Sequence, residues 1–168
     1  MLFSRRALLT AAVVAPLAGC GFKLRGRFTL PFETVYLDMQ RNTPMAAQIA
    51  RQLRGGSNAK LVDSPEAAQA ILKVIRVSRE RSILSKNAKG VAREYLLRLT
   101  VTFKVTAPDG SEYLPQTSIT AERSLMYDDT EYLSRDSEEA LFYNEMQSDI
   151  VSQLRRRIER AQVSAKEA

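Results

Sequence analysis

The clearest pattern in the chain is an alternation of apolar and polar side chains between residues 94 and 105, interrupted only at Leu96. The apolar positions are Tyr95, Leu97, Leu99, Val101, Phe103 and Val105. A period of two residues is typical of a β-strand that packs one face on a core and leaves the other in water or against a partner. The turn signal at residues 107–110 predicts another strand over residues 117–125. Pro115 favours an edge position or a late start for that strand.

The first half of the chain predicts a strand, a helix and a second long strand. Alternation over residues 34–39 indicates the first strand. Thr43 is suited to cap a helix with Pro44 at its first position, and Gly55-Gly56 is suited to end it. The helix places Met45, Ile49 and Leu53 on one face. A strand over residues 70–84 then favours a right-handed crossover between parallel neighbours.

A long helix closes the chain. Asp136 and Glu139 have the spacing of a capping box at its start. Its apolar stripe comprises Tyr143, Met146, Ile150, Leu154, Ile158 and Ala161. These elements predict an α+β fold, a two-layer sandwich of a four-stranded mixed β-sheet with two α-helices packed on one face. We expect residues 34–162 to form this single domain and residues 163–168 to be a disordered tail.

The N-terminus has the layout of a secretory signal. Basic residues precede an apolar run from Ala7 to Ala18, which is too short for a permanent membrane span of about 20 residues. Ala18-Gly19 stands directly before Cys20, and this order resembles the bacterial lipobox. We therefore expect residues 1–19 to be removed and Cys20 to carry a diacylglyceryl group and an acylated amine. Residues 20–33 would form the lipidated tether.

Two features near the anchor have more than one interpretation. The segment Ser4–Leu9 fits either twin-arginine or ordinary Sec export. Lys23, Arg25 and Arg27 either face anionic head groups or belong to a solvated linker. Gly21 stands where Asp would retain a lipoprotein in the inner membrane, so the sorting rule of bacteria implies the outer membrane.

Composition excludes several classes of chemistry. The chain of 168 residues has no histidine and one cysteine, so the usual zinc and copper ligand sets and the histidine-containing catalytic triads are absent. The carboxylate pairs Asp128-Asp129 and Glu138-Glu139 are neighbours in sequence, which point in different directions and do not build an acid/base pair. We therefore expect neither an enzyme nor a cofactor.

Charge is distributed unevenly. Residues 73–104 carry nine basic side chains and two acidic ones, a net charge of +7, whereas residues 128–145 have a net charge of −6. An exported protein meets no nucleic acid, so phosphate or carboxylate on lipids, glycolipids or another protein is the expected partner of the basic run. A plain solvated strand face is the alternative interpretation.

The block Cys20-Gly21-Phe22-Lys23-Leu24-Arg25, joined to the lipobox, resembles the LptE family, once called rare lipoprotein B. Weaker similarities continue at Leu30-Pro31, Val35–Leu37, Arg93–Tyr95 and Leu133–Glu138. The resemblance implies a sheet with two helices, and an outer-membrane lipoprotein on the periplasmic side. Such a protein lies in the lumen of the LptD β-barrel in a 1:1 complex, as its plug and assembly partner, and binds lipopolysaccharide (LPS) for delivery to the outer leaflet.

The resemblance also implies where LPS would bind. The family places one basic residue at the tip between the second and third long strands and another at the start of the last helix. The second matches Arg135, whereas the first falls at Ala88, which Lys86 and Lys89 flank. We therefore expect Lys86, Lys89 and Arg135, together with Arg93, to contact lipid A phosphates. The alternative function is an accessory lipoprotein of the general barrel-assembly machinery, or a scaffold that contacts the cell wall.

Overall fold

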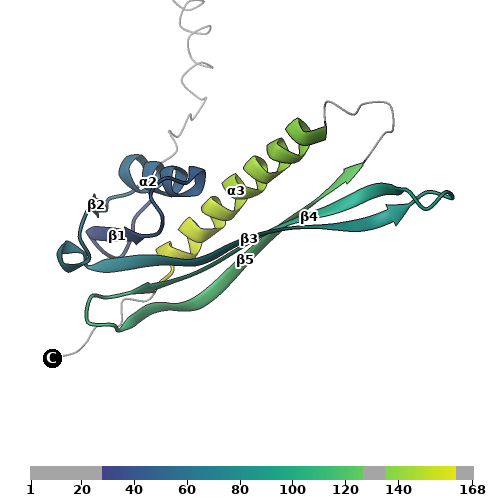
Figure 1. Cartoon of the computed structure of the whole chain (residues 1–168). Helices are drawn as coiled ribbons and strands as arrows, with labels where there is room; N and C mark the ends of the chain where they lie inside the picture. Colours follow the sequence, from purple (N-terminus) through teal and green to yellow (C-terminus); the bar gives the residue numbers. More distant parts are fainter. Residues whose placement is uncertain (1–27, 127–134, 162–168) are drawn as a thin grey trace, which may run out of the picture.

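Five strands form one mixed sheet with two helices on one of its faces (Figure 1). The computed structural model describes residues 28–126 and 135–161, with the backbone alone for residues 135 and 136. The strand order in the sheet is β2-β1-β3-β4-β5. In chain order the elements are β1 (Thr34–Asp38), α2 (Pro44–Gly56), β2 (Lys60–Val62), a short 3-10 helix (Pro65–Ala67), β3 (Ala70–Lys86), β4 (Ala92–Thr106), β5 (Glu112–Met126) and α3 (Arg135–Glu159).

The predicted α+β class and the two helices on one face are confirmed, and so is the parallel pairing of β1 with β3. The sheet has one strand more than the four predicted. The added strand is β2, whose three residues pair with β1 in parallel. A strand this short has no periodicity of its own, because its hydrogen bonds to β1 define it.

The core lies between the helices and the inner face of the sheet. β4 lies between β3 and β5, and its alternation is confirmed: Leu97, Leu99, Val101, Phe103 and Val105 are fully buried, and Tyr95 is partly buried. The complete predicted stripe of α3 is also buried, from Tyr143 to Ala161. A helix and a strand that each bury one apolar face on the other are the basic unit of a two-layer domain.

The structure also moves three boundaries. β5 starts at Glu112 and contains Pro115, so the edge position is confirmed and the late start is wrong. α3 begins at Arg135, one residue before the expected cap. The folded part includes residues expected in the tether, because Leu30 and Phe32 belong to the buried core. The Asn58 amide fixes Leu30 by accepting from its N–H at 2.6 Å and donating to its carbonyl at 3.1 Å.

The end of α2 provides a matched pair of glycines. A Cβ added at Gly56 would lie 2.8 Å from Cε1 of Phe28, whereas one added at Gly55 would meet nothing within 4 Å. We expect Gly56→Ala to displace the Phe28 ring and lower the free energy of unfolding by about 1–3 kcal/mol. Gly55→Ala should leave that free energy equal or raise it by less than about 1 kcal/mol, because alanine favours helix. Urea unfolding of both variants measures the difference, and equal losses would contradict it.

Candidate functional site at the tip of the long hairpin

The β3–β4 hairpin extends beyond the body of the molecule, and its tip has a defined turn (Figure 1). The Asn87 side-chain oxygen accepts hydrogen bonds from the N–H groups of Lys89, at 3.0 Å, and Val91, at 2.9 Å. Gly90 completes the turn with a φ of +79°, a conformation that favours glycine. This turn fixes the backbone that carries Lys86 and Lys89, two of the predicted site residues.

The structure divides the basic run into paired and unpaired side chains. Within the described residues, four basic side chains of the run form salt bridges: Lys73 with Asp38, Arg81 with Glu139, Arg98 with Glu80 and Glu122, and Lys104 with Glu112. The predicted residues Lys86, Lys89 and Arg93 are exposed and have no carboxylate partner in the same described part of the chain. Of the five basic side chains of the run that no described carboxylate pairs with, these three lie at or next to the tip, whereas Arg76 and Arg79 lie farther along β3.

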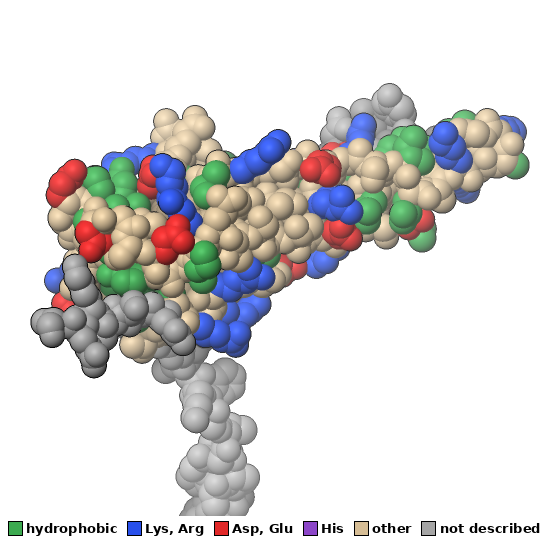
Figure 2. All heavy atoms as spheres, turned by 90° about the horizontal axis from the view of Figure 1, so that it is seen from below, with side chains coloured by type: hydrophobic (Ala, Val, Ile, Leu, Met, Phe, Trp, Pro, Cys, Tyr) green, Lys and Arg blue, Asp and Glu red, His purple; other side chains and the backbone are tan. Residues whose placement is uncertain are grey.

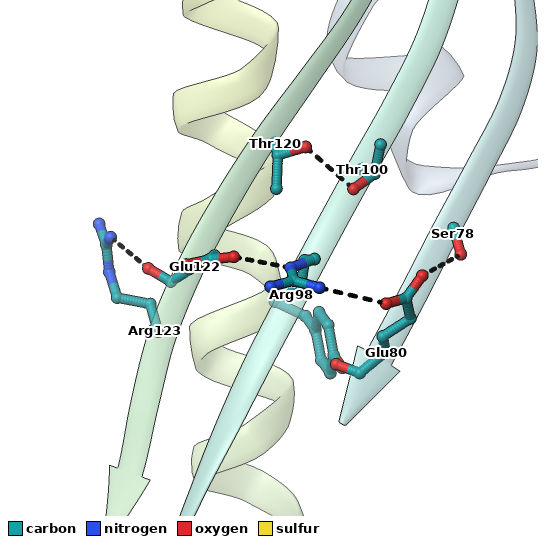
Figure 3. A network of polar contacts seen from close by, with 8 residues as sticks. Ser78, Glu80, Arg98, Thr100, Thr120, Glu122 and Arg123 are labelled. Carbon is teal, nitrogen blue, oxygen red and sulfur yellow. Dashed lines mark hydrogen bonds and ion pairs between the residues drawn. The ribbon is translucent and has the colours of Figure 1, made fainter. Parts of the chain in front are cut away.

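Arg98 shows why a basic residue in the middle of the sheet is not available. Its Nε donates to Glu122 at 2.6 Å, and its Nη1 lies 3.6 Å from Glu80 (Figure 3). The hydrogen bond to Glu122 is the main cause that raises the pKa of Arg98, and Glu80 adds to it. Two carboxylates on neighbouring strands thus satisfy this guanidinium, and the surrounding positions are hydroxyls such as the Thr100–Thr120 pair at 3.1 Å.

Two arginines on the helix-facing side of β3 line a shallow cleft beside α3. The Arg79 guanidinium lies 4.9 Å from the centroid of the Tyr143 ring, and Arg81 lies 3.0 Å from Glu139. The Tyr143 hydroxyl donates to the Glu80 carbonyl at 3.1 Å. Burial, and secondarily Glu139, raise the pKa of Tyr143 above its ordinary value of 10.0, so this donor is neutral at physiological pH. Neither arginine is among the site residues predicted from the sequence, although their spacing of two places both on one strand face.

Large apolar side chains are exposed at the same end of the molecule. They are Ile83, Leu84, Val91 and Met126, with exposures of 49–78%. Met126 is opposite Glu94 in the β4–β5 register, and Ile83 is opposite Tyr95 in the β3–β4 register. Apolar and basic side chains therefore mix near the tip (Figure 2). This mixture suits a ligand that combines anionic groups with hydrocarbon chains.

Arg135 and the tip lie toward the same end of the molecule but at different positions along the β3–β4 hairpin. The Arg81–Glu139 salt bridge sets the position of α3 along β3. Helical rise places Arg135 about 6 Å beyond Glu139, and strand rise places Lys86 about 17 Å beyond Arg81. Along the hairpin the tip thus extends about 10 Å past the start of α3. The structure therefore does not bring the backbone of Arg135 next to Lys86 and Lys89. Cys20 and the acids at 128–131 lie outside the described residues.

The opposite turn of the sheet provides a control for the tip. There the Asp109 side chain accepts from the Ser111 N–H at 2.9 Å, and Gly110 has a φ of +90°. We expect Asn87→Ala and Asp109→Ala to lower the free energy of unfolding by similar amounts, about 1 kcal/mol. Only Asn87→Ala should speed amide exchange at Lys89 and Val91 and weaken binding of an anionic amphiphile. Equal weakening of binding by both variants would show that the tip has no special role.

Comparisons with known proteins agree with this architecture. A family model described as lipopolysaccharide-assembly (LptE) matches residues 32–158. The LPS-assembly lipoprotein LptE of Photorhabdus laumondii is 31% identical over 154 residues, which cover 90% of this chain and 83% of the relative. That of Pectobacterium atrosepticum is 30% identical over 155 residues, with the same coverage of 90% and 83%.

Two solved structures are also similar. A lipoprotein B from Nitrosomonas europaea superposes with a TM-score of 0.69 at 32% identity, covering 80% of this chain and 87% of that one. The rare lipoprotein B from Shewanella oneidensis superposes with a TM-score of 0.66 at 26% identity, covering 75% and 93%. The family resemblance of the sequence is thereby confirmed, and this chain belongs to the LptE family of lipopolysaccharide-assembly lipoproteins.

Proposed function

We propose that this non-enzymatic assembly lipoprotein is anchored in the outer membrane through Cys20, forms a 1:1 complex with the LptD β-barrel and binds LPS at its hairpin tip. In this proposal it fills the barrel lumen as a plug, assists barrel assembly and takes part in LPS delivery to the outer leaflet. Family membership supports the role in LPS assembly. Among the described residues, no helix is long and apolar enough to cross a bilayer.

The LPS-binding part of the proposal rests on the exposed basic and apolar side chains at the tip. Lys86, Lys89 and Arg93 are basic, exposed and without a described carboxylate partner, and exposed apolar side chains surround them. LPS offers phosphates and acyl chains close together, and lysines and arginines bind phosphate through charge-assisted hydrogen bonds. Arg135 would add a cation from the start of α3.

A triple substitution tests the LPS site. We expect Lys86→Ala/Lys89→Ala/Arg135→Ala in the mature chain to weaken LPS binding about 10–100-fold, because three charge-assisted contacts are lost. The matched control is Arg41→Ala/Lys73→Ala/Lys104→Ala, which removes the same charge from residues already paired with carboxylates. Surface plasmon resonance on immobilised LPS compares them. Unchanged binding by the tip variant, or an equal loss in the control, would contradict the proposed site.

The partner is tested separately. After extraction in mild detergent, we expect the chain to co-purify with LptD at a ratio of 1:1. A different barrel from the assembly machinery, or peptidoglycan, in place of LptD would support the accessory or scaffold function.

A further inference from the structure

Among the described residues, no strand pairs with one long edge of the sheet. β1 pairs with β3 only from Ala70 to Lys73, so the remaining part of β3, Val74–Lys86, is paired on one side alone, with β4. We call this the β3 edge. Its thirteen residues span about 43 Å at 3.3 Å per residue (Figure 1). The one contact from outside the sheet to its backbone among the described residues is the hydrogen bond that Tyr143 donates to the Glu80 carbonyl.

The other edge of the sheet is protected. β5 contains Pro115, which has no N–H to offer a new strand. α3 also reaches this edge, since Arg157 donates to the Ser118 carbonyl at 3.3 Å and Arg123 pairs with Asp149 at 2.9 Å. Its large apolar side chains are buried or partly buried except for Met126 at its last position. Natural proteins cover or blunt edges in this way to prevent pairing with other chains.

The β3 edge is less protected, and it carries both apolar and charged exposed side chains. It contains no proline, and Ile75, Val77, Ile83 and Leu84 are exposed by 43–53%. Its three irregular points lie between Val74 and Arg76, between Ile83 and Ser85, and between Ser85 and Lys86. Between the first two of these points, residues 76–83 form a regular ladder with β4, long enough to accept a strand of about six to eight residues.

The charge of the β3 edge decides which kind of strand can pair with it. The β3 edge contains four basic residues (Arg76, Arg79, Arg81 and Lys86), of which Arg81 is paired with Glu139, and one acidic residue, Glu80, which is paired with Arg98. Pairing with a second copy would place like charges opposite one another, which destabilises a sheet. A strand that carries carboxylates would instead be complementary.

We infer that the β3 edge accepts, by main-chain hydrogen bonding, an extended segment of the partner barrel that alternates apolar and acidic residues. The identity of the donor rests on the proposed function. A closed barrel has no free strand edge, so the segment must come from a loop that reaches the lumen. The β3 edge would then hold the plug in a fixed orientation, while the tip stays free for its ligand.

Hydrogen exchange measured by mass spectrometry or NMR tests the inference directly. We expect about half of the amides at residues 76–83 to exchange at least 10-fold more slowly in the complex with LptD than in the acylated chain alone. The fraction is one half because only alternate N–H groups point outward from an edge strand. The amides of β5 serve as the internal control, and their exchange rates should be the same in the complex and in the free chain. An intact complex in which residues 76–83 exchange as in the free chain would overturn the edge assignment and leave the proposed function standing.

Charge reversal provides a second measurement. Arg76→Glu/Arg79→Glu should reduce the amount of LptD recovered with the chain at least 10-fold. The control Arg51→Glu/Arg54→Glu makes the same change of charge on the exposed side of α2 and should leave the recovery of LptD unchanged. Circular dichroism checks that both variants fold. Equal recovery with both variants would overturn the inference.

Absence of LptD from the wild-type preparation would contradict the proposed function and, with it, the identity of the strand donor. Protection of the edge in the free chain at high concentration would mean that a second copy covers it.

Discussion

Replacing Phe103 by alanine is expected to lower the free energy of unfolding by about 3–5 kcal/mol, the cost of removing a buried aromatic side chain and leaving a cavity. Phe103 is fully buried in β4, where it is opposite Val74 on β3 and Thr117 on β5. Strands on both sides and helices above restrict the collapse of the cavity. Guanidinium unfolding of the mature chain carrying Ser in place of Cys20 measures the loss without a detergent.

Thr102 is the matched control for this substitution. It is the preceding residue of β4 and faces the open side of the sheet, where its hydroxyl forms a hydrogen bond of 2.9 Å with Ser118. Thr102→Ala should lower the free energy of unfolding by about 1 kcal/mol or less, because water can replace the lost partner of an exposed hydrogen bond. If both variants lost the same stability, burial on one face would not be the source of the stability of this strand.

The contrast between these two neighbours explains why β4 could be predicted. One face of the strand is buried from Leu97 to Val105, so the requirement for apolar side chains recurs at every second position and is visible in the sequence. The same holds for α3, whose stripe from Tyr143 to Ala161 meets the sheet. β3 shows the opposite case, since beyond Val74 its side chains are largely exposed and its pattern is weak. Its length is set by pairing with β4.

The candidate site could be predicted only in part. The basic run is evident from the sequence, but which of its members are neutralised depends on contacts between distant residues. Arg81 meets Glu139, 58 positions later, and Lys73 meets Asp38 on the neighbouring strand. No local pattern indicates such pairs. The structure removes these cations from consideration and leaves Lys86, Lys89 and Arg93 at the tip.

The proposed functions use adjoining parts of one hairpin, which overlap at Ile83, Leu84 and Lys86. The tip offers free cations and apolar side chains, whereas the β3 edge offers backbone groups along the shaft. The polar face around Arg98 satisfies its own charges through Glu80 and Glu122. A plug with this arrangement can dock along its length without covering the tip. Substitutions at the tip should therefore change LPS binding with little effect on recovery of the barrel, and substitutions along the edge should do the reverse.

Cys20→Ser is expected to abolish membrane anchoring altogether, because we propose that every acyl chain of the mature protein is attached at this residue. Each buried CH₂ contributes about 0.8 kcal/mol, and two or more chains are needed for stable attachment. The seven residues between Cys20 and the folded part at Phe28 carry Lys23, Arg25 and Arg27, which are worth about 1 kcal/mol each near an anionic surface and cannot replace the chains.

The variant should be exported behind a signal with an ordinary cleavage site, so that an uncleaved signal does not hold it in the inner membrane. We expect the wild type in the outer-membrane fraction with incorporated palmitate, and the variant in the soluble periplasmic fraction without it. Thermal unfolding of the variant should match that of a wild-type chain from which residues 1–20 have been removed, since Cys20 precedes the core that begins at Leu30. Palmitate incorporated into the variant, or a wild-type mass without acyl chains, would contradict the proposed anchor.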